Sequence, residues 1–80
     1  MAEERQHYDA LIDARGLVCP MPLVKARQAL QVLGSGATVC VLATDPAAER
    51  DFEDFADATG HTLDDVTKAE GVLRLVLRKR

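Results

Sequence analysis

The spacing of apolar residues along the chain predicts four β-strands. Residues 7–14 (HYDALIDA) and residues 72–78 (VLRLVLR) place apolar side chains at alternate positions, which is the period of a strand with one buried face. Residues 38–44 (TVCVLAT) are almost all apolar or β-branched, a pattern typical of a central strand buried on both faces. Residues 61–68 form a weaker candidate, because two adjacent aspartates interrupt the pattern.

Two segments between these strands have the period of an α-helix instead. The first begins at Pro20 and is expected to stop at Gly34, while the second is opened by Asp45 and Pro46 and closed by Gly60. In both, the apolar positions fall on one face, which we expect to cover the sheet. These positions are Leu23, Ala26, Leu30 and Leu33 in the first helix and Ala48, Phe52, Phe55, Ala56 and Thr59 in the second.

The order of the elements, βαβαββ, limits the possible folds. A strand–helix–strand unit forms a right-handed parallel crossover in nearly all known cases. Two short helices are enough to cover one face of a four-stranded sheet. We therefore predict a two-layer α/β (α+β) sandwich, with a mixed sheet and both helices on one face. Residues 1–80 are expected to form a single domain, in which residues 1–6 are a flexible tail.

Composition narrows the class of protein. The net charge is −3, and aromatic residues make up only 4% of the chain, so the basic cluster at residues 74–80 lacks base-stacking partners and we expect no direct nucleic-acid binding. The N-terminal sequence MAEERQ does not resemble a secretory signal, and no apolar run could span a bilayer, so we expect a cytoplasmic protein that does not bind membranes. In the cytoplasm two cysteines favour free thiols over a disulfide, because that compartment keeps thiols reduced. The lack of CxxC or HxxxH spacing argues against a metal site, and we expect no cofactor.

The stretch GLVCPMP places one cysteine at the expected start of the first helix. Pro20 can take the first helical position and Pro22 lies in the first turn, where no intrahelical donor is lost, so Cys19 is the expected N-cap. The helix dipole and the free N–H groups there favour a thiolate, and Arg15 and Lys25 add positive charge. We therefore predict a nucleophilic thiol with a lowered pKa, which the two prolines hold in a fixed and exposed position.

Four further features of the sequence bear on the candidate site or on the core. Asp13 either binds backbone in the loop before the reactive cysteine or is an acid at a strand end. Asp45 is expected to cap the second helix, whose start should lie at the same edge of the sheet as the cysteine. Cys40 is expected to be a packed core residue. The acidic segment 49–57 is expected to be a solvated helix face, with a docking surface as the alternative.

The residues LIDARGLVCPMPLVKARQAL resemble the signature of the TusA family of sulfur-carrier proteins, a Leu/Ile-Asp-x-x-Gly-x-x-Cys-Pro-x-Pro run. The segment ATDPAAERDF is similar to the start of the family's second helix, and the likeness extends from Tyr8 to Lys79. The resemblance implies the two-layer fold and a persulfide carried on Cys19. Many members have Glu between the two prolines, where this chain has Met21.

The resemblance also implies partners. The donor would be a cysteine desulfurase or a rhodanese-like protein, and the acceptor a relay protein with a reactive cysteine, serving tRNA thiolation or sulfur oxidation. The chain shows no obvious general base or second nearby cysteine, so we expect a carrier, monomeric when free, without a complete catalytic cycle of its own. A redox-sensing interaction module on the same fold is the alternative function, and an RNA-binding domain is a third, based on fold analogy alone.

Overall fold

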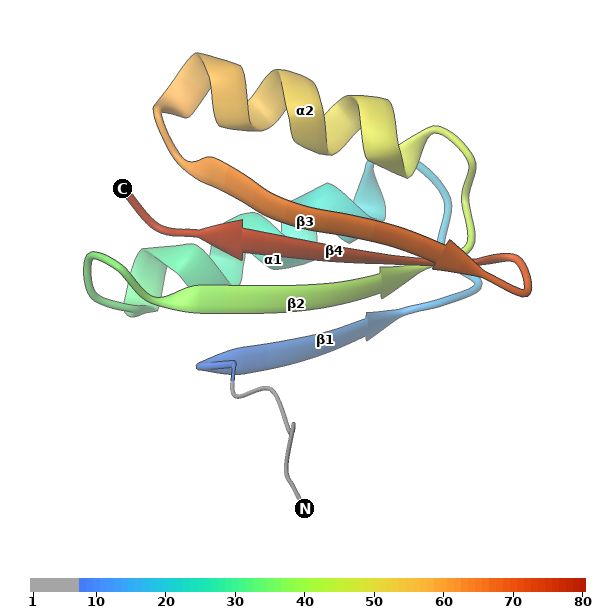
Figure 1. Cartoon of the computed structure of the whole chain (residues 1–80), viewed down its shortest axis with the longest axis horizontal. Coiled ribbons are helices and arrows are strands. Elements are labelled where there is room, and N and C mark those ends of the chain that lie inside the picture. Colours follow the sequence, from blue (N-terminus) through green and yellow to red (C-terminus); the bar gives the residue numbers. More distant parts are fainter. Residues whose placement is uncertain (1–7) are drawn as a thin grey trace.

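A computed structural model describes residues 8–80 and contains six elements in the expected order (Figure 1). The elements are β1 (Ala10–Ala14), α1 (Met21–Val32), β2 (Thr38–Ala43), α2 (Ala48–Thr59), β3 (Thr62–Ala69) and β4 (Val72–Arg78). β1 begins at Ala10, two residues after the first described position. The expected tail at residues 1–6, and the predicted start of the first strand at His7, lie outside the described residues.

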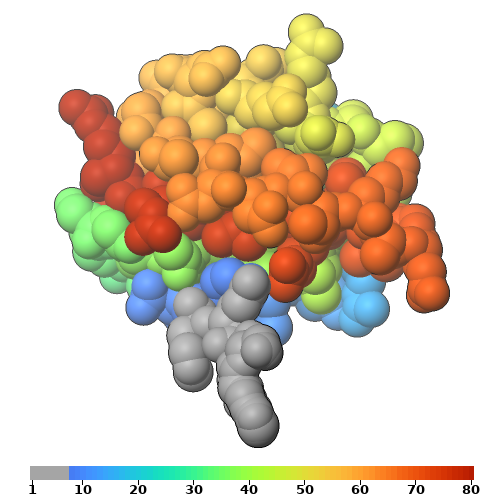
Figure 2. Space-filling view, viewed as in Figure 1, coloured from blue at the N-terminus to red at the C-terminus, as the bar shows by residue number. Residues whose placement is uncertain are grey.

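The four strands form one mixed sheet in the order β1-β2-β4-β3. β1 and β2 are parallel, whereas β4 is antiparallel to both of its neighbours, β2 and β3. In Figure 1, α1 lies behind the sheet and α2 runs along β3, and the space-filling view shows α2 directly beside β3 (Figure 2). The predicted α/β (α+β) sandwich with a mixed four-stranded sheet is confirmed.

The core lies between the helices and one face of the sheet. Alternate residues of the two central strands point into it, and Phe52 of α2 is its one buried aromatic residue among those described. The strand residues of this core are Val39, Val41 and Ala43 of β2 and Leu73, Leu75 and Leu77 of β4. On the opposite face, Cys40 is only 1% exposed, so β2 is buried on both faces as its sequence predicts.

Helix starts and one helix end differ from the sequence prediction by a few residues. α1 begins at Met21 with Pro20 as its N-cap, because Pro20 has non-helical backbone angles (φ −101°, ψ 18°). Cys19 therefore lies one residue before the N-cap, and the prediction that it is the N-cap is wrong. α1 also ends earlier than predicted, at Val32 rather than at Gly34. The Lys79 Nζ donates hydrogen bonds to the carbonyl oxygens of Leu30 and Leu33 at this helix end.

α2 also begins later than predicted. The turn formed by Asp45, Pro46 and Ala47 is closed by a hydrogen bond from the Ala48 N–H to the Asp45 carbonyl oxygen, and Ala47 is the N-cap. The helix ends at Gly60, as predicted, because this glycine adopts the left-handed conformation (φ 85°) that favours glycine. Within residues 8–80, neither helix is long and apolar enough to cross a membrane.

β3 is a continuous strand, although its sequence pattern is interrupted. The two adjacent aspartates are accommodated by a register shift between Leu63 and Asp65, which is a β-bulge. Asp64 and Asp65 form ion pairs with Arg78 and Arg74 of β4. Interstrand charge pairing therefore replaces the apolar alternation that the sequence lacks here.

Candidate functional site

Cys19 lies at the edge of the sheet where the parallel strands β1 and β2 both end. The loop after β1 and the loop after β2 run side by side there (Figure 1). Two hydrogen bonds join the loops, one from the Gly16 N–H to the Thr44 hydroxyl oxygen (2.9 Å) and one from the Cys19 N–H to the Asp45 Oδ2 (2.5 Å). The thiol is exposed on these two joined loops, which we call the platform.

Asp45 is brought to the cysteine, but its role differs from the predicted helix cap. Its Oδ1 accepts the N–H of Ala47, still outside the helix, and its Oδ2 accepts the N–H of Cys19. The bond from Ala47 and then the bond from Cys19 lower the pKa of the Asp45 carboxyl, because both favour its ionised form. One carboxylate thus links the start of α2 to the loop that carries the thiol.

The nearest charged partner of the thiol is Asp51, which the sequence interpretation left within a solvated helix face. The Cys19 Sγ donates a hydrogen bond to the Asp51 Oδ2 at 2.6 Å. That bond, desolvation, and the negative charges of Asp51 and Asp45 all raise the pKa of the Cys19 thiol. The prediction of a lowered pKa is therefore wrong, because carboxylates rather than cations surround the sulfur.

The two cations expected to activate the thiol do not do so. Arg15 binds Asp13 through two side-chain hydrogen bonds of 2.8 Å, and these bonds lower the Asp13 pKa to about 2 and raise the pKa of Arg15. Asp13 also accepts the Arg15 N–H at 3.2 Å, so of its two interpretations the loop-binding one is confirmed. Lys25 is exposed on α1, and neither cation is among the charges that shift the thiol.

The two prolines have different environments. Pro20 is exposed at the helix start and follows Cys19 through a cis peptide bond, whereas Pro22 is fully buried in the first turn of α1. Pro22 therefore anchors the start of the helix in the protein interior, and Pro20 lies at the surface beside the thiol. The predicted role of the two prolines, which is to hold the thiol in a fixed position, stays a prediction.

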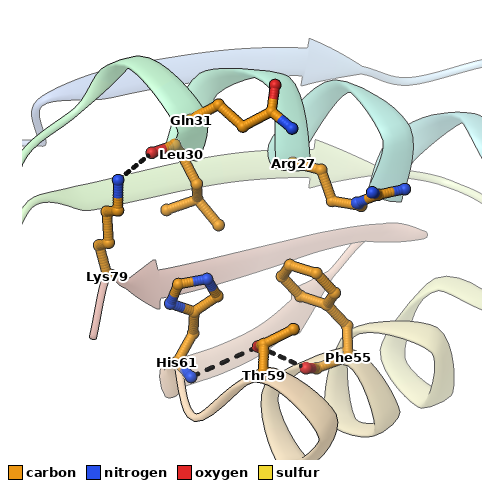
Figure 3. Close-up of a pocket in the computed structure, with 7 residues that line it drawn as sticks. All are labelled: Arg27, Leu30, Gln31, Phe55, Thr59, His61 and Lys79. Carbon is orange, nitrogen blue, oxygen red and sulfur yellow. Dashed lines mark hydrogen bonds between the residues drawn. The ribbon is translucent and has the colours of Figure 1, made fainter.

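A groove between α1 and α2 leads away from the thiol. Its first part, with a volume of about 500 Å³, is lined by Cys19, Pro20, Leu23, Arg27, Asp51, Asp54, Phe55 and Thr59. Figure 3 shows its continuation, where the Leu30 side chain points across the groove toward His61 and Phe55, and Arg27 lies at the α1 rim. His61 packs against Phe55 at 5.5 Å between ring centroids, and Lys79 lies at the far end. The thiol thus lies at one end of a partly apolar groove.

Sequence reasoning missed Asp51 because the contact joins residues 32 positions apart. The available signal was the shared sheet edge, since both helices start there and Asp51 is in the first turn of the second. Cys40, by contrast, is buried as predicted, and burial raises the pKa of its thiol. Cys19 is therefore the exposed one of the two cysteines in the chain.

Comparisons with known proteins point to one family. The family model described as sulfurtransferase TusA matches residues 10–79. A putative sulfur carrier protein from Neisseria meningitidis serogroup A is 42% identical over 69 residues, covering 86% of this chain and 93% of the relative. The sulfur carrier protein TusA of Allochromatium vinosum is 36% identical over 72 residues, with coverage of 90% and 95%.

A solved structure has the same fold. The crystal structure of a SirA-like protein from Desulfitobacterium hafniense superposes with a TM-score of 0.78 at 31% sequence identity. The match covers 86% of this chain and 95% of the other. The similarity thus includes both helices and the sheet that present the exposed thiol.

Proposed function

The chain belongs to the TusA family of sulfur carriers, and we propose that it carries sulfane sulfur as a persulfide on Cys19. The observation that supports this assignment is the contrast between the two thiols. The Cys19 Sγ is exposed on a loop held at two points, whereas Cys40 is 1% exposed in the sheet. A group that must reach another protein's cysteine requires the exposed position.

The chemistry requires two exchanges between cysteines. In the first, the Cys19 thiolate attacks the outer sulfur of a donor persulfide, and the donor leaves as a thiolate. In the second, an acceptor cysteine attacks the outer sulfur on Cys19 and releases the Cys19 thiolate. Neither exchange needs a cofactor or an external oxidant, because each transfers sulfur at the zero oxidation level between thiols.

Membership of a sulfur-carrier family implies interaction with donor and acceptor proteins. As the donor we propose a cysteine desulfurase or a rhodanese-like protein, and as the acceptor a relay protein of tRNA thiolation or sulfur oxidation. Protein docking beside the thiol is supported by Val18 (68% exposed) and Met21 (41% exposed), two apolar residues close to Cys19 in the sequence whose side chains lie at the surface. The redox-sensor alternative has no observation of its own in its favour, because the raised pKa of Cys19 disfavours the thiolate that both oxidation and sulfur transfer require.

The test is intact-mass spectrometry after incubation with inorganic polysulfide, and separately with a cysteine desulfurase and cysteine. We expect wild type and Cys40→Ala to gain one sulfur atom and Cys19→Ser to gain none. Loaded wild-type protein should then transfer its sulfur to an acceptor thiol. Sulfur on Cys40 in the Cys19→Ser variant, or a loaded Cys19 that transfers nothing, would exclude the carrier assignment.

A further inference from the structure

The side chain closest to the reactive sulfur is a carboxylate of α2, and its effect opposes the activation that a nucleophilic thiol needs. Asp51 Oδ2 lies 2.6 Å from Cys19 Sγ and accepts a hydrogen bond from the thiol. A carboxylate in this position stabilises the thiol and disfavours the thiolate, which is the species that attacks a persulfide. In the free protein the Cys19 thiol is therefore exposed but favoured in its protonated, less nucleophilic form.

The charges around the sulfur do not offset this effect. The titratable and charged residues that face Cys19 come from α2, from the loop after β2 and from the groove wall of α1, and they are Asp51, Asp54, Asp45 and Arg27. Asp51 and Asp45 are the residues whose charge acts on the thiol, and both favour its protonated form. Arg15, the nearest cation in sequence, is held by Asp13 at 2.8 Å.

We propose that Asp51 keeps Cys19 protonated in the free carrier and selects partners that present a cationic side chain beside their reactive cysteine. This rests on the proposed carrier role of Cys19. A lysine or arginine of the docked partner pairs with Asp51, and the carboxylate then no longer holds the thiol proton. Docking thereby supplies the positive charge that this chain does not place at its own sulfur, and activation is restricted to the complex.

The step balances without any further reagent. The Cys19 thiol loses its proton to solvent, and its thiolate attacks the outer sulfur of the donor persulfide. A bond forms between that sulfur and Cys19 Sγ, the S–S bond of the donor breaks, and its electron pair leaves with the donor thiolate, which takes up a proton. The donor cysteine is reduced to a thiol and Cys19 is oxidised to a persulfide.

The first measurement is the pH dependence of Cys19 alkylation by iodoacetamide in the free protein. Asp51→Asn should move the profile to lower pH and speed alkylation several-fold at neutral pH. Asp57→Asn is the matched control, because Asp57 is an exposed aspartate of the same helix outside the groove lining, and its profile should match wild type. Circular dichroism establishes that each variant is folded. An Asp51→Asn profile that stays in place, or moves to higher pH, would overturn the proposal.

The second measurement tests the partner's charge. Two short peptides carry a persulfide on a central cysteine, flanked in one by lysines and in the other by glutamates. Wild type should load faster from the lysine peptide, on the order of tenfold, as expected for a unit charge pair near contact in water. In Asp51→Asn the ratio should fall toward the intrinsic ratio of the two peptides, whereas Asp57→Asn should keep the wild-type ratio. An undiminished ratio in Asp51→Asn would refute the selection, while failure of Cys19 to load from either peptide would instead refute the carrier role.

Discussion

Truncating Phe52 tests how α2, and with it the site, is held on the sheet. The buried residues of α2 are Ala48, Phe52 and Ala56, so Phe52 is the one large side chain that fixes this helix in the core. It is 0% exposed, and Phe→Ala changes at such positions cost about 3–5 kcal/mol. A domain of 80 residues has a total stability of about 4–12 kcal/mol, so Phe52→Ala should remove a large part of it.

Phe55 provides the matched control on the same helix. Its ring is only partly buried and lines the groove, so Phe55→Ala should cost about 1–2 kcal/mol, less than a fully buried ring. Urea unfolding followed by circular dichroism gives both values. If Phe52→Ala is too unstable to measure, the pair Phe52→Leu and Phe55→Leu should keep the same order. An equal or greater cost at Phe55 would show that the core is not anchored as described.

Two further outcomes follow from charged contacts. Arg15→Ala should raise the Asp13 pKa from about 2 toward its ordinary value of 3.8, as measured by NMR titration. In wild type the low pKa of Asp13 stabilises the fold above pH 3.8, and this stabilisation is lost as the pH falls to about 2. The variant should lack most of this pH dependence of stability. Lys79→Met should lower the free energy of unfolding by about 1.5–3 kcal/mol, since the carbonyls of Leu30 and Leu33 lose a charged donor, and urea unfolding that shows no loss would contradict this role.

The sequence was sufficient to predict the layers of this fold because burial has a local signature. The alternation of Leu73, Leu75 and Leu77 and the continuous apolar run of β2 reflect which faces are covered, and both are readable without the tertiary structure. The exact helix starts were not predictable in this way. A proline fits either side of a helix boundary, so Pro20 and Pro46 locate the boundary only to within one or two residues.

The electrostatics of the site depend on contacts that no local pattern encodes. Asp13 and Arg15 are two residues apart, so their pairing could have been anticipated, and it removes the nearest cation from the thiol. The bonds from Cys19 to Asp45 and Asp51 span 26 and 32 residues and depend on how the two helices are placed. The sequence therefore predicted correctly which of the two cysteines is exposed and assigned the wrong direction to its pKa.

The bond between the Cys19 N–H and Asp45 has a practical consequence for the loop. The donor is a main-chain group, so a serine or an alanine at position 19 can make the same bond to the Asp45 Oδ2. The platform is therefore built independently of the sulfur, and removing the thiol leaves the surrounding surface in place. Such a variant would occupy a partner's binding site without accepting cargo, and so would serve as a competitive inhibitor of the wild-type carrier and as bait for isolating its partners.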